Sequence, residues 1–410
     1  MIKTPLHEGA EPTPPIVLHV PHASTVVPSD VRDEFVLGNE ALAEEHRRLV
    51  DHFTDELFAL PPALATTVVF PVSRFVLDPE RFADDAHEPM AGRGMGVIYQ
   101  RTIDGTPLRR SLTPVEREAL LDRYYRPHHE RLTTAVTRAI EANNGCLLLD
   151  AHSFASRPLP CDRDQELERP DICVGTDAFH TPAALVDAVV SLCMAQGWTV
   201  EVDRPFSGAI VPLAYLHQDA RVRAVMIEVN RRLYLDEDSG QKGPAFQECQ
   251  ARLSRVLHSL AEAERAADYM RRLESAYAST TFIARVAERQ LSIRVGQHLP
   301  ALDDILEEHG AEAWAFITAW NPAFETLAPA ENDERQRRLT RDLRRLGVAL
   351  YPGSGESADG RWPAEESVLA IGLGEGEALR VGREYGQNTV VVGGRGSSAR
   401  LAWCTPRLIV

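Results

Sequence analysis

CLLLDAHS, residues 146–153, begins as a continuous apolar run and ends in charged and polar residues. A short run of this kind is typical of a strand that is buried on both faces of a parallel sheet. Asp150, His152 and Ser153 then stand where such a strand ends. Because ligands bind beyond the carboxyl ends of the strands in open α/β sheets, this stretch predicts a fold class and also the place of a site.

Two other segments repeat this change from apolar to polar. IVLHV at 16–20 is followed by Pro21 and His22, and VMI at 225–227 is followed by Glu228. Two histidines and two or three carboxylates at one sheet edge have the composition of a zinc site with a general base. No HExxH motif joins them, so the prediction depends on distant segments that converge.

Strands and helices alternate around these segments. Further strands are expected at residues 66–72, 171–175 and 199–202, and helices at 40–60, 114–142, 182–196 and 244–273. This alternation predicts an α/β fold with a mostly parallel sheet.

A second, smaller α/β domain is expected after the long helix. We place the boundary so that residues 1–274 form the first domain and residues 275–410 the second. GLGEG at 372–376 follows an expected strand and opens an expected helix, which suits a phosphate. Its spacing is not GxGxxG, and Glu375 and Glu377 oppose an anion, so nucleotide binding is the weaker interpretation.

Composition limits the partners. The 410 residues carry 44 basic and 60 acidic side chains, a net charge of −16, which disfavours nucleic acid and anionic membranes. No apolar run suits a membrane span or a signal peptide, so we expect a cytoplasmic protein. The six cysteines have no CxxC spacing, which argues against a cysteine zinc site. The oligomeric state is not predicted.

Several motifs occur in the order seen in N-formylglutamate amidohydrolases, a family that the chain resembles over residues 14–260. They include HVPHAS at 19–24, SRFVLDPERF at 73–82, DAHSF at 150–154, RPFSGAIVP at 204–212 and IEVNRRLY at 227–234. The resemblance implies a three-layer α/β/α fold distantly related to zinc carboxypeptidases, with a metal at the strand ends. It also implies hydrolysis of N-formyl-L-glutamate to formate and glutamate.

The C-terminal domain resembles a family of unknown function (DUF3293). The match is carried by WAFITAWNP at 314–322, ENDERQ at 331–336 and YGQN at 385–388. This second resemblance implies no role.

His22 and His152 are the predicted zinc ligands, because an imidazole at the end of a rigid strand holds its nitrogen in a fixed place. The third ligand is expected on the helix over residues 40–60. Asp51 lies at one edge of its apolar face and is favoured, and Asp55, one turn later, is the alternative. Zn²⁺ is expected, with another divalent cation as the alternative.

Glu228 follows a buried strand, where an acid is costly unless it is paired or functional. By resemblance it activates the zinc-bound water and passes the proton to the leaving amine. The alternative is an ion pair with Arg231 or Arg232. His129 matches the family's PYH motif, which implies contact with the substrate or the oxyanion. His128 is expected on the surface, because adjacent helical positions point about 100° apart.

An anionic N-acyl amino acid requires arginine forks. Arg74 and Arg81, on either side of Asp78, are predicted to bind substrate carboxylates, and Asp78 is a substrate-binding candidate with them. Arg231 and Asn230, which follow Glu228, are further substrate-binding candidates. Gly208 lies in an expected tight loop, where a missing side chain allows close approach of the backbone to a ligand.

One substitution departs from the family pattern. The family has DxNR where this chain has Asp78-Pro79-Glu80-Arg81, so Glu80 replaces an expected asparagine. This change opens the alternative of a substrate other than N-formylglutamate. It also motivates a second hypothesis, a catalytically inactive or regulatory homologue that binds a small molecule or a protein. The two hypotheses differ in metal content and amidase activity.

Overall fold

The structure is a computed structural model that describes residues 13–322, 326–356 and 364–404, without the side chains of 268–273. It divides into two compact units, one up to Asp268 and one from Tyr269 onward. No helix among the described residues is long and apolar enough to cross a membrane.

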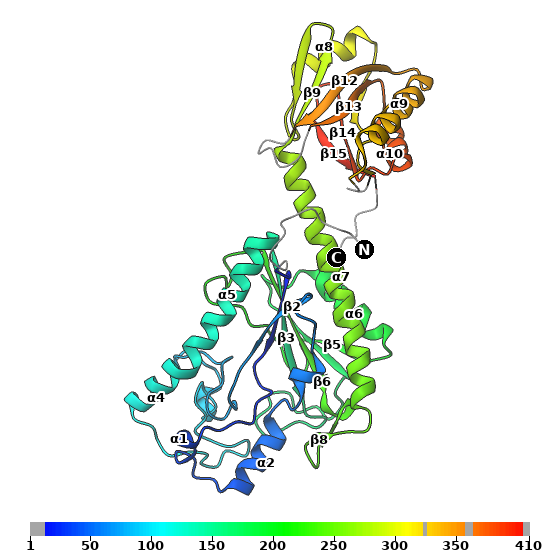
Figure 1. Cartoon of the computed structure of the whole chain (residues 1–410). Helices are drawn as coiled ribbons and strands as arrows, with labels where there is room; N and C mark the ends of the chain where they lie inside the picture. The colour runs from blue at the N-terminus through cyan, green and yellow to red at the C-terminus, as the bar shows by residue number, and fades with distance from the viewer. Residues whose placement is uncertain (1–12, 323–325, 357–363, 405–410) are drawn as a thin grey trace. The chain divides into compact units, whose positions relative to one another are not determined.

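The first unit is built on a mixed six-stranded sheet (Figure 1). Its strands are β1 (Ile16–Val20), β2 (Ala65–Val69), β3 (Cys146–Phe154), β4 (Ile172–Gly175), β5 (Val200–Val202) and β6 (Val222–Asn230). They are arranged in the order β2-β1-β3-β6-β4-β5, and all neighbours are parallel except β6 and β4. The predicted α/β class is therefore confirmed.

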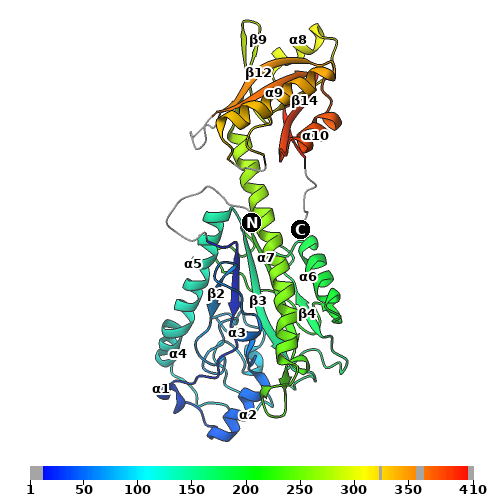
Figure 2. The same cartoon turned by 45° about the vertical axis from the view of Figure 1, so that its right-hand side comes forward.

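Helices cover both faces of this sheet (Figure 2). α5 (Arg126–Asn143) packs on one face, and α6 (Ala183–Ala195) and α7 (Phe246–Ser279) pack on the other. Along β1, Val17 packs with α5, whereas Leu18 belongs to the cluster on the α7 side. Because both faces are buried, the central strands are apolar at nearly every position.

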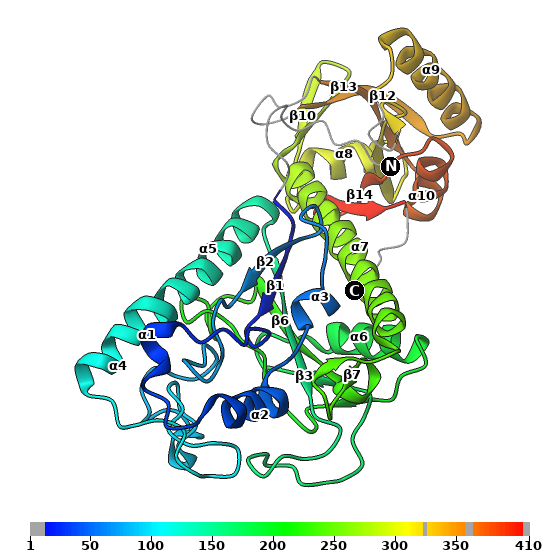
Figure 3. The same cartoon turned by 60° about the horizontal axis from the view of Figure 1, so that its bottom comes forward.

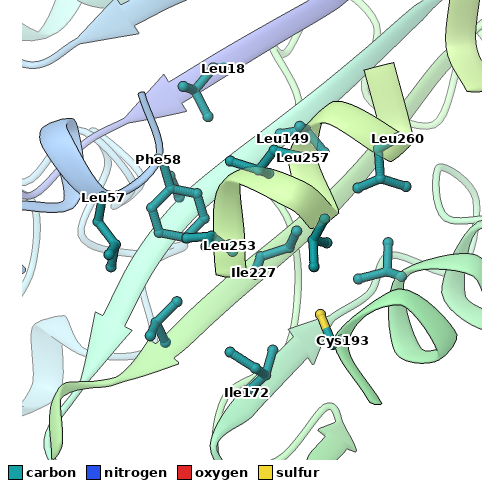
Figure 4. Packing of buried hydrophobic residues seen from close by; sticks show 14 of the residues in the cluster. Leu18, Leu57, Phe58, Leu149, Ile172, Cys193, Ile227, Leu253, Leu257 and Leu260 are labelled. Carbon is teal, nitrogen blue, oxygen red and sulfur yellow. The ribbon is translucent and has the colours of Figure 1, made fainter. Parts of the chain in front are cut away.

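The core on the α7 side fixes the central strands in place. Figure 4 shows Leu253, Leu257 and Leu260 of α7 near Leu149 of β3 and Ile227 of β6. Each of these side chains is at most 1% exposed. The spacing of the three leucines places them on one helix face. Truncation of such a leucine to alanine costs about 2–5 kcal/mol, so the sheet is a rigid support for the residues at its edge.

The helix predicted over residues 40–60 is interrupted in the structure. The chain forms α2 (Asn39–Leu49) and a single turn, α3 (Thr54–Leu57), with an extended Val50 and a left-handed Phe53 (φ 62°) between them. Asp51 therefore lies in a loop, where its N–H donates to the carbonyl of His22. α2 lies near the sheet edge at which the strands end (Figure 3). Helical periodicity continued through this break and hid it.

Shorter elements complete the first unit. The helix predicted at 114–142 is α4 (Pro114–Leu120), a π-helical turn (Leu121–Tyr125) and α5. The remainder are α1 (Ser29–Arg32), the 3₁₀ turns η1 (Ala91–Arg93) and η3 (Arg231–Leu233), and the strands β7 (Leu235–Asp236) and β8 (Gln241–Lys242).

The second unit contains a seven-stranded sheet in which every neighbouring pair is antiparallel. A second domain with strands and helices is therefore present, but it lacks the parallel sheet of the α/β class that was predicted for it. Its strands are β9 (Thr281–Val286), β10 (Arg289–Ile293), β11 (Ala313–Ile317), β12 (Ala349–Glu356), β13 (Glu365–Ile371), β14 (Thr389–Gly394) and β15 (Arg400–Trp403). Its helices are α8 (Pro300–Glu308), α9 (Pro329–Arg345) and α10 (Glu375–Glu384). The sequence predicts strands at 280–286, 314–318, 368–371 and 389–392, which correspond to β9, β11, β13 and β14. It does not predict β10, β12 and β15; β12 contains Pro352 and two glycines, which disfavour a strand in sequence.

A buried histidine in α2 makes the first unit sensitive to acid. His46 is 9% exposed, its Nε2 lies 2.8 Å from Ser73 Oγ, and burial lowers its pKa to about 4. Protonation is therefore easier in the unfolded chain, and the stability contribution is complete above the unfolded pKa of about 6.5. We expect about 3 kcal/mol of unfolding free energy to be lost as pH falls toward 4.

This loss of unfolding free energy can be measured by urea titrations between pH 6.5 and 4. Hydrogen exchange in peptides of the first unit reports its unfolding separately from that of the second unit. The variant His46→Gln cannot be protonated and should show a flatter dependence on pH. An identical pH dependence in the two proteins would show that His46 does not contribute.

Candidate metal centre and active site

Three neighbouring strands deliver polar side chains to one edge of the first sheet. β1 lies beside β3 with His19 opposite Asp150, and β3 lies beside β6 with His152 opposite Glu228. His22 follows the last residue of β1 by two positions. Parallel strands end at the same edge, so the order of the sheet brings these distant segments together.

The three predicted ligands form one buried group. His22, Asp51 and His152 each offer a ligand atom within 4.8 Å of the other two. Asp51 Oδ2 lies 3.2 Å from His152 Nδ1 and 3.7 Å from His22 Nδ1. All three side chains are buried, whereas the alternative Asp55 is exposed and outside the group. Two imidazoles and one carboxylate are a donor set that suits Zn²⁺.

Carboxylates orient both imidazoles from the opposite side of each ring. His22 Nε2 donates to Asp78 Oδ1 at 2.9 Å, and His152 Nε2 is hydrogen-bonded to Glu80 Oε1 at 3.1 Å, with Asp150 Oδ1 at 3.2 Å. This arrangement directs Nδ1 of each ring toward Asp51. His22 Nδ1 is a buried atom without a hydrogen-bond partner among the described residues. An unsatisfied buried nitrogen beside a carboxylate fits a bound cation.

The electrostatics of the group favour positive charge. Burial and Arg74 oppose protonation of His22, but Asp78 and Asp51 outweigh them and raise its pKa. Burial likewise opposes protonation of His152, and neighbouring carboxylates raise its pKa well above the ordinary value. A cation would take the place of these protons, because metal binding to histidine releases them.

Glu228 is buried on the central strand beside His152. Its side chain is 6% exposed, and burial raises its pKa to about 8. The predicted ion-pair partners are engaged elsewhere, because Arg231 lies 2.9 Å from Asp51 and Arg232 lies 2.8 Å from Asp171. A buried carboxyl whose proton is held near neutral pH can act as a general base and acid.

Asp78 and its flanking arginines form a tight cluster. Asp78 is fully buried and accepts hydrogen bonds from His22, Arg74 and the hydroxyl of Tyr99. Arg81 is more open, with a side chain 28% exposed and Nε 3.8 Å from Asp78. Tyr99 was missed by the sequence analysis; its only signal is its place in the long loop of residues 73–113.

The two substrate candidates after Glu228 bind protein groups. Arg231 donates to Asp51 and to the carbonyl of Leu49, so it holds the loop that carries the candidate ligand. Asn230 donates to the carbonyl of Pro170 and is fully buried. Neither arrangement was expected from the sequence.

The remaining candidates lie around the same edge. Gly208 has φ of 96°, a conformation that favours glycine, and a Cβ there would meet nothing within 4 Å. His129 Nε2 lies 2.8 Å from the carbonyl of Pro79, so it contacts the loop that carries Glu80. The prediction that His128 lies on the surface is wrong. His128 is fully buried, and its Nε2 lies 2.8 Å from His19 Nε2.

The chain is similar in sequence to known proteins. The sequence model of the N-formylglutamate amidohydrolase family matches residues 14–235, and that of a protein of unknown function (DUF3293) matches residues 317–390. N-formylglutamate deformylase of Pseudomonas aeruginosa is 29% identical over 236 residues, which cover 55% of this chain and 84% of that protein.

A solved structure is also similar. The crystal structure of N-formylglutamate amidohydrolase from Ralstonia eutropha JMP134 has a TM-score of 0.55 and 26% sequence identity. The match covers 64% of this chain and 97% of the Ralstonia chain.

Proposed function

The chain belongs to the N-formylglutamate amidohydrolase family, and on this premise we propose that it hydrolyses the amide bond of an N-formyl or N-acyl amino acid. N-formyl-L-glutamate is the first expected substrate, with formate and glutamate as products. The buried group His22, Asp51 and His152 beside Glu228 is the observation that carries the proposal. We assign the sites to the first of the two proposed domains, residues 1–274, and no role to residues 275–410.

One divalent cation, Zn²⁺ by its ligand preference, would be held by His22, Asp51 and His152. When bound, it supplies Lewis acidity that polarises a carbonyl and lowers the pKa of water. Asp78 and Asp150 orient the two imidazoles. The three layers, with a site at the strand ends, support the distant relationship to zinc carboxypeptidases that the resemblance implies.

Glu228 would move the proton. As a carboxylate it takes a proton from the water that attacks the acyl carbon. It then gives that proton to the nitrogen as the C–N bond breaks, so the amine leaves neutral. Burial disfavours the ionised form of Glu228, and positive charge beside it favours that form.

A panel of N-acyl amino acids, tested with metal content measured in parallel, examines the proposal. Turnover of N-formylglutamate by metal-loaded protein supports it. A folded protein that binds these compounds without turnover would favour the binding homologue instead. We propose further that the enzyme acts in the cytoplasm on a small anionic molecule, without nucleic acid or membrane partners.

Arg81 is proposed to bind the substrate carboxylate. Its Nε is buried without a hydrogen-bond partner among the described residues. We expect Arg81→Ala to raise KM about 10–100-fold, which corresponds to the loss of one charged hydrogen bond. Initial rates over a range of N-formylglutamate concentrations measure this change.

Two features of the chain make this test specific. Glu88 lies near Arg81 and still accepts hydrogen bonds from the N–H groups of Phe82 and Met90 when Arg81 is removed. Arg126→Ala serves as the control, because Arg126 is exposed on α5 and pairs with Glu118. An unchanged KM in Arg81→Ala would refute the role.

A further inference from the structure

His152 has carboxylates on both edges of its ring. Its Nδ1 faces Asp51, whereas its Nε2 lies 3.2 Å from Asp150 Oδ1 and 3.1 Å from Glu80 Oε1. On this second edge, His19, Glu80 and Asp150 offer ligand atoms within 4.8 Å of one another. This group is separate from the proposed ligands of the first cation.

Histidines are the basic partners of Asp150 and Glu80. His19 Nδ1 lies 2.9 Å from Asp150 Oδ1 and His152 Nε2 lies 3.1 Å from Glu80 Oε1, so each carboxylate has one imidazole donor. Among the described residues, no arginine or lysine lies within 4.0 Å of either carboxylate. Asp150 is 2% exposed, and two neighbouring carboxylates without a fixed positive charge are costly there. A cation at this point would supply that charge.

Glu80 also reaches the first group. Its Oε2 lies 3.7 Å from His22 Nδ1, the buried nitrogen that has no hydrogen-bond partner among the described residues. His22 is 2% exposed, and the Glu80 side chain is 20% exposed. The Glu80 carboxylate thus lies close to the unsatisfied Nδ1 of His22 and also belongs to the second group of ligand atoms.

His19 is held in an orientation that suits a ligand. Its Nε2 lies 2.8 Å from Nε2 of the fully buried His128. His128 Nδ1 accepts from Arg131 at 3.4 Å, so the hydrogen of a neutral His128 is on Nε2 and donates to His19. The His19 hydrogen is then on Nδ1, which donates to Asp150, and a cation bound at this atom would replace that hydrogen.

We propose that His19, Glu80 and Asp150 form a second divalent-cation site, with the His152 ring between the two cations. One imidazole and two carboxylates are richer in oxygen than the first group, which suits Mn²⁺ as well as Zn²⁺. The inference rests on the proposed function only through the first cation site. Glu80 supplies a charge that an amide side chain would not supply.

Metal counting on the full chain tests this proposal. Metal-free protein is dialysed to equilibrium against Mn²⁺, and bound metal per chain is measured by elemental analysis. We expect two ions per chain in the wild type and one in Glu80→Gln. Asp85→Asn is the matched control in the same loop and should retain two, because Asp85 is exposed and pairs with Arg117. Melting of the metal-free proteins shows whether each variant folds.

Two results would overturn the second site. These are one ion per wild-type chain, and two ions in a folded Glu80→Gln variant. Hydrolysis of N-formylglutamate, measured on the same samples, separates this proposal from the proposed function. Two ions without hydrolysis support the second site and reject the function, whereas hydrolysis with one ion rejects the second site alone.

Discussion

Glu228→Gln is expected to lower kcat for N-formylglutamate hydrolysis by about 10²–10⁴-fold, the usual contribution of a positioned general base. Glutamine has nearly the same size but cannot accept and return a proton. Glu228 lies opposite His152 in the register of β3 and β6 and is outside the group of His22, Asp51 and His152. Metal content should therefore be unchanged, and initial rates with elemental analysis measure both quantities.

Measurements of stability show whether Glu228→Gln loses activity because proton transfer is lost or because the protein unfolds. Burial raises the pKa of Glu228 to about 8, so the metal-free wild type loses stability as pH rises from the unfolded pKa of about 4.3 to 8. Glutamine has no charge to bury, and metal-free Glu228→Gln should be the more stable protein at pH 7. Glu201→Gln, on the edge strand β5, should keep its rate within about twofold. Full activity of a metal-loaded Glu228→Gln protein would contradict the assigned role.

The sequence contained enough information to predict which segments meet. Strands such as 146–149 are apolar because helices cover both faces of the sheet, so a continuous apolar run marks a central strand. Polar residues directly after such runs lie at a common edge when the strands are parallel. His22, His152 and Glu228 were selected by this reasoning, and the register of β1, β3 and β6 places the ends of their segments side by side.

Local sequence patterns could not predict the paths of loops or the contacts between distant segments. Asp51 was selected on a helix that does not extend to it, and its position depends on a left-handed Phe53 and on a hydrogen bond to His22. His128 was expected on the surface because helical periodicity does not show that His19 lies against it. Glu80 was noticed only as a departure from a motif. Its place between two histidines is set by the path of a long loop, for which no periodicity exists.

His152→Ala is expected to abolish cation binding by the first group and to lower kcat/KM at least about 10³-fold, because a catalytic cation supplies several kcal/mol of transition-state stabilisation. The His152 ring contributes Nδ1 beside Asp51 and is hydrogen-bonded through Nε2. Alanine removes both contacts. Bound Zn²⁺ per chain and N-formylglutamate hydrolysis are measured on the same preparation.

Removal of the metal with a chelator tests, without a mutation, how far hydrolysis depends on the cation. Wild-type protein stripped of metal should lose activity to the level of His152→Ala and regain it when Zn²⁺ is returned, whereas the variant should not respond. His217→Ala is the control, because His217 is 59% exposed and pairs with Asp177 away from the site. Activity that survives complete removal of metal would reject the cation and leave the buried histidines and carboxylates as a proton-binding network. Activity that returns in His152→Ala with added Zn²⁺ would instead show that the ion is held without this ligand.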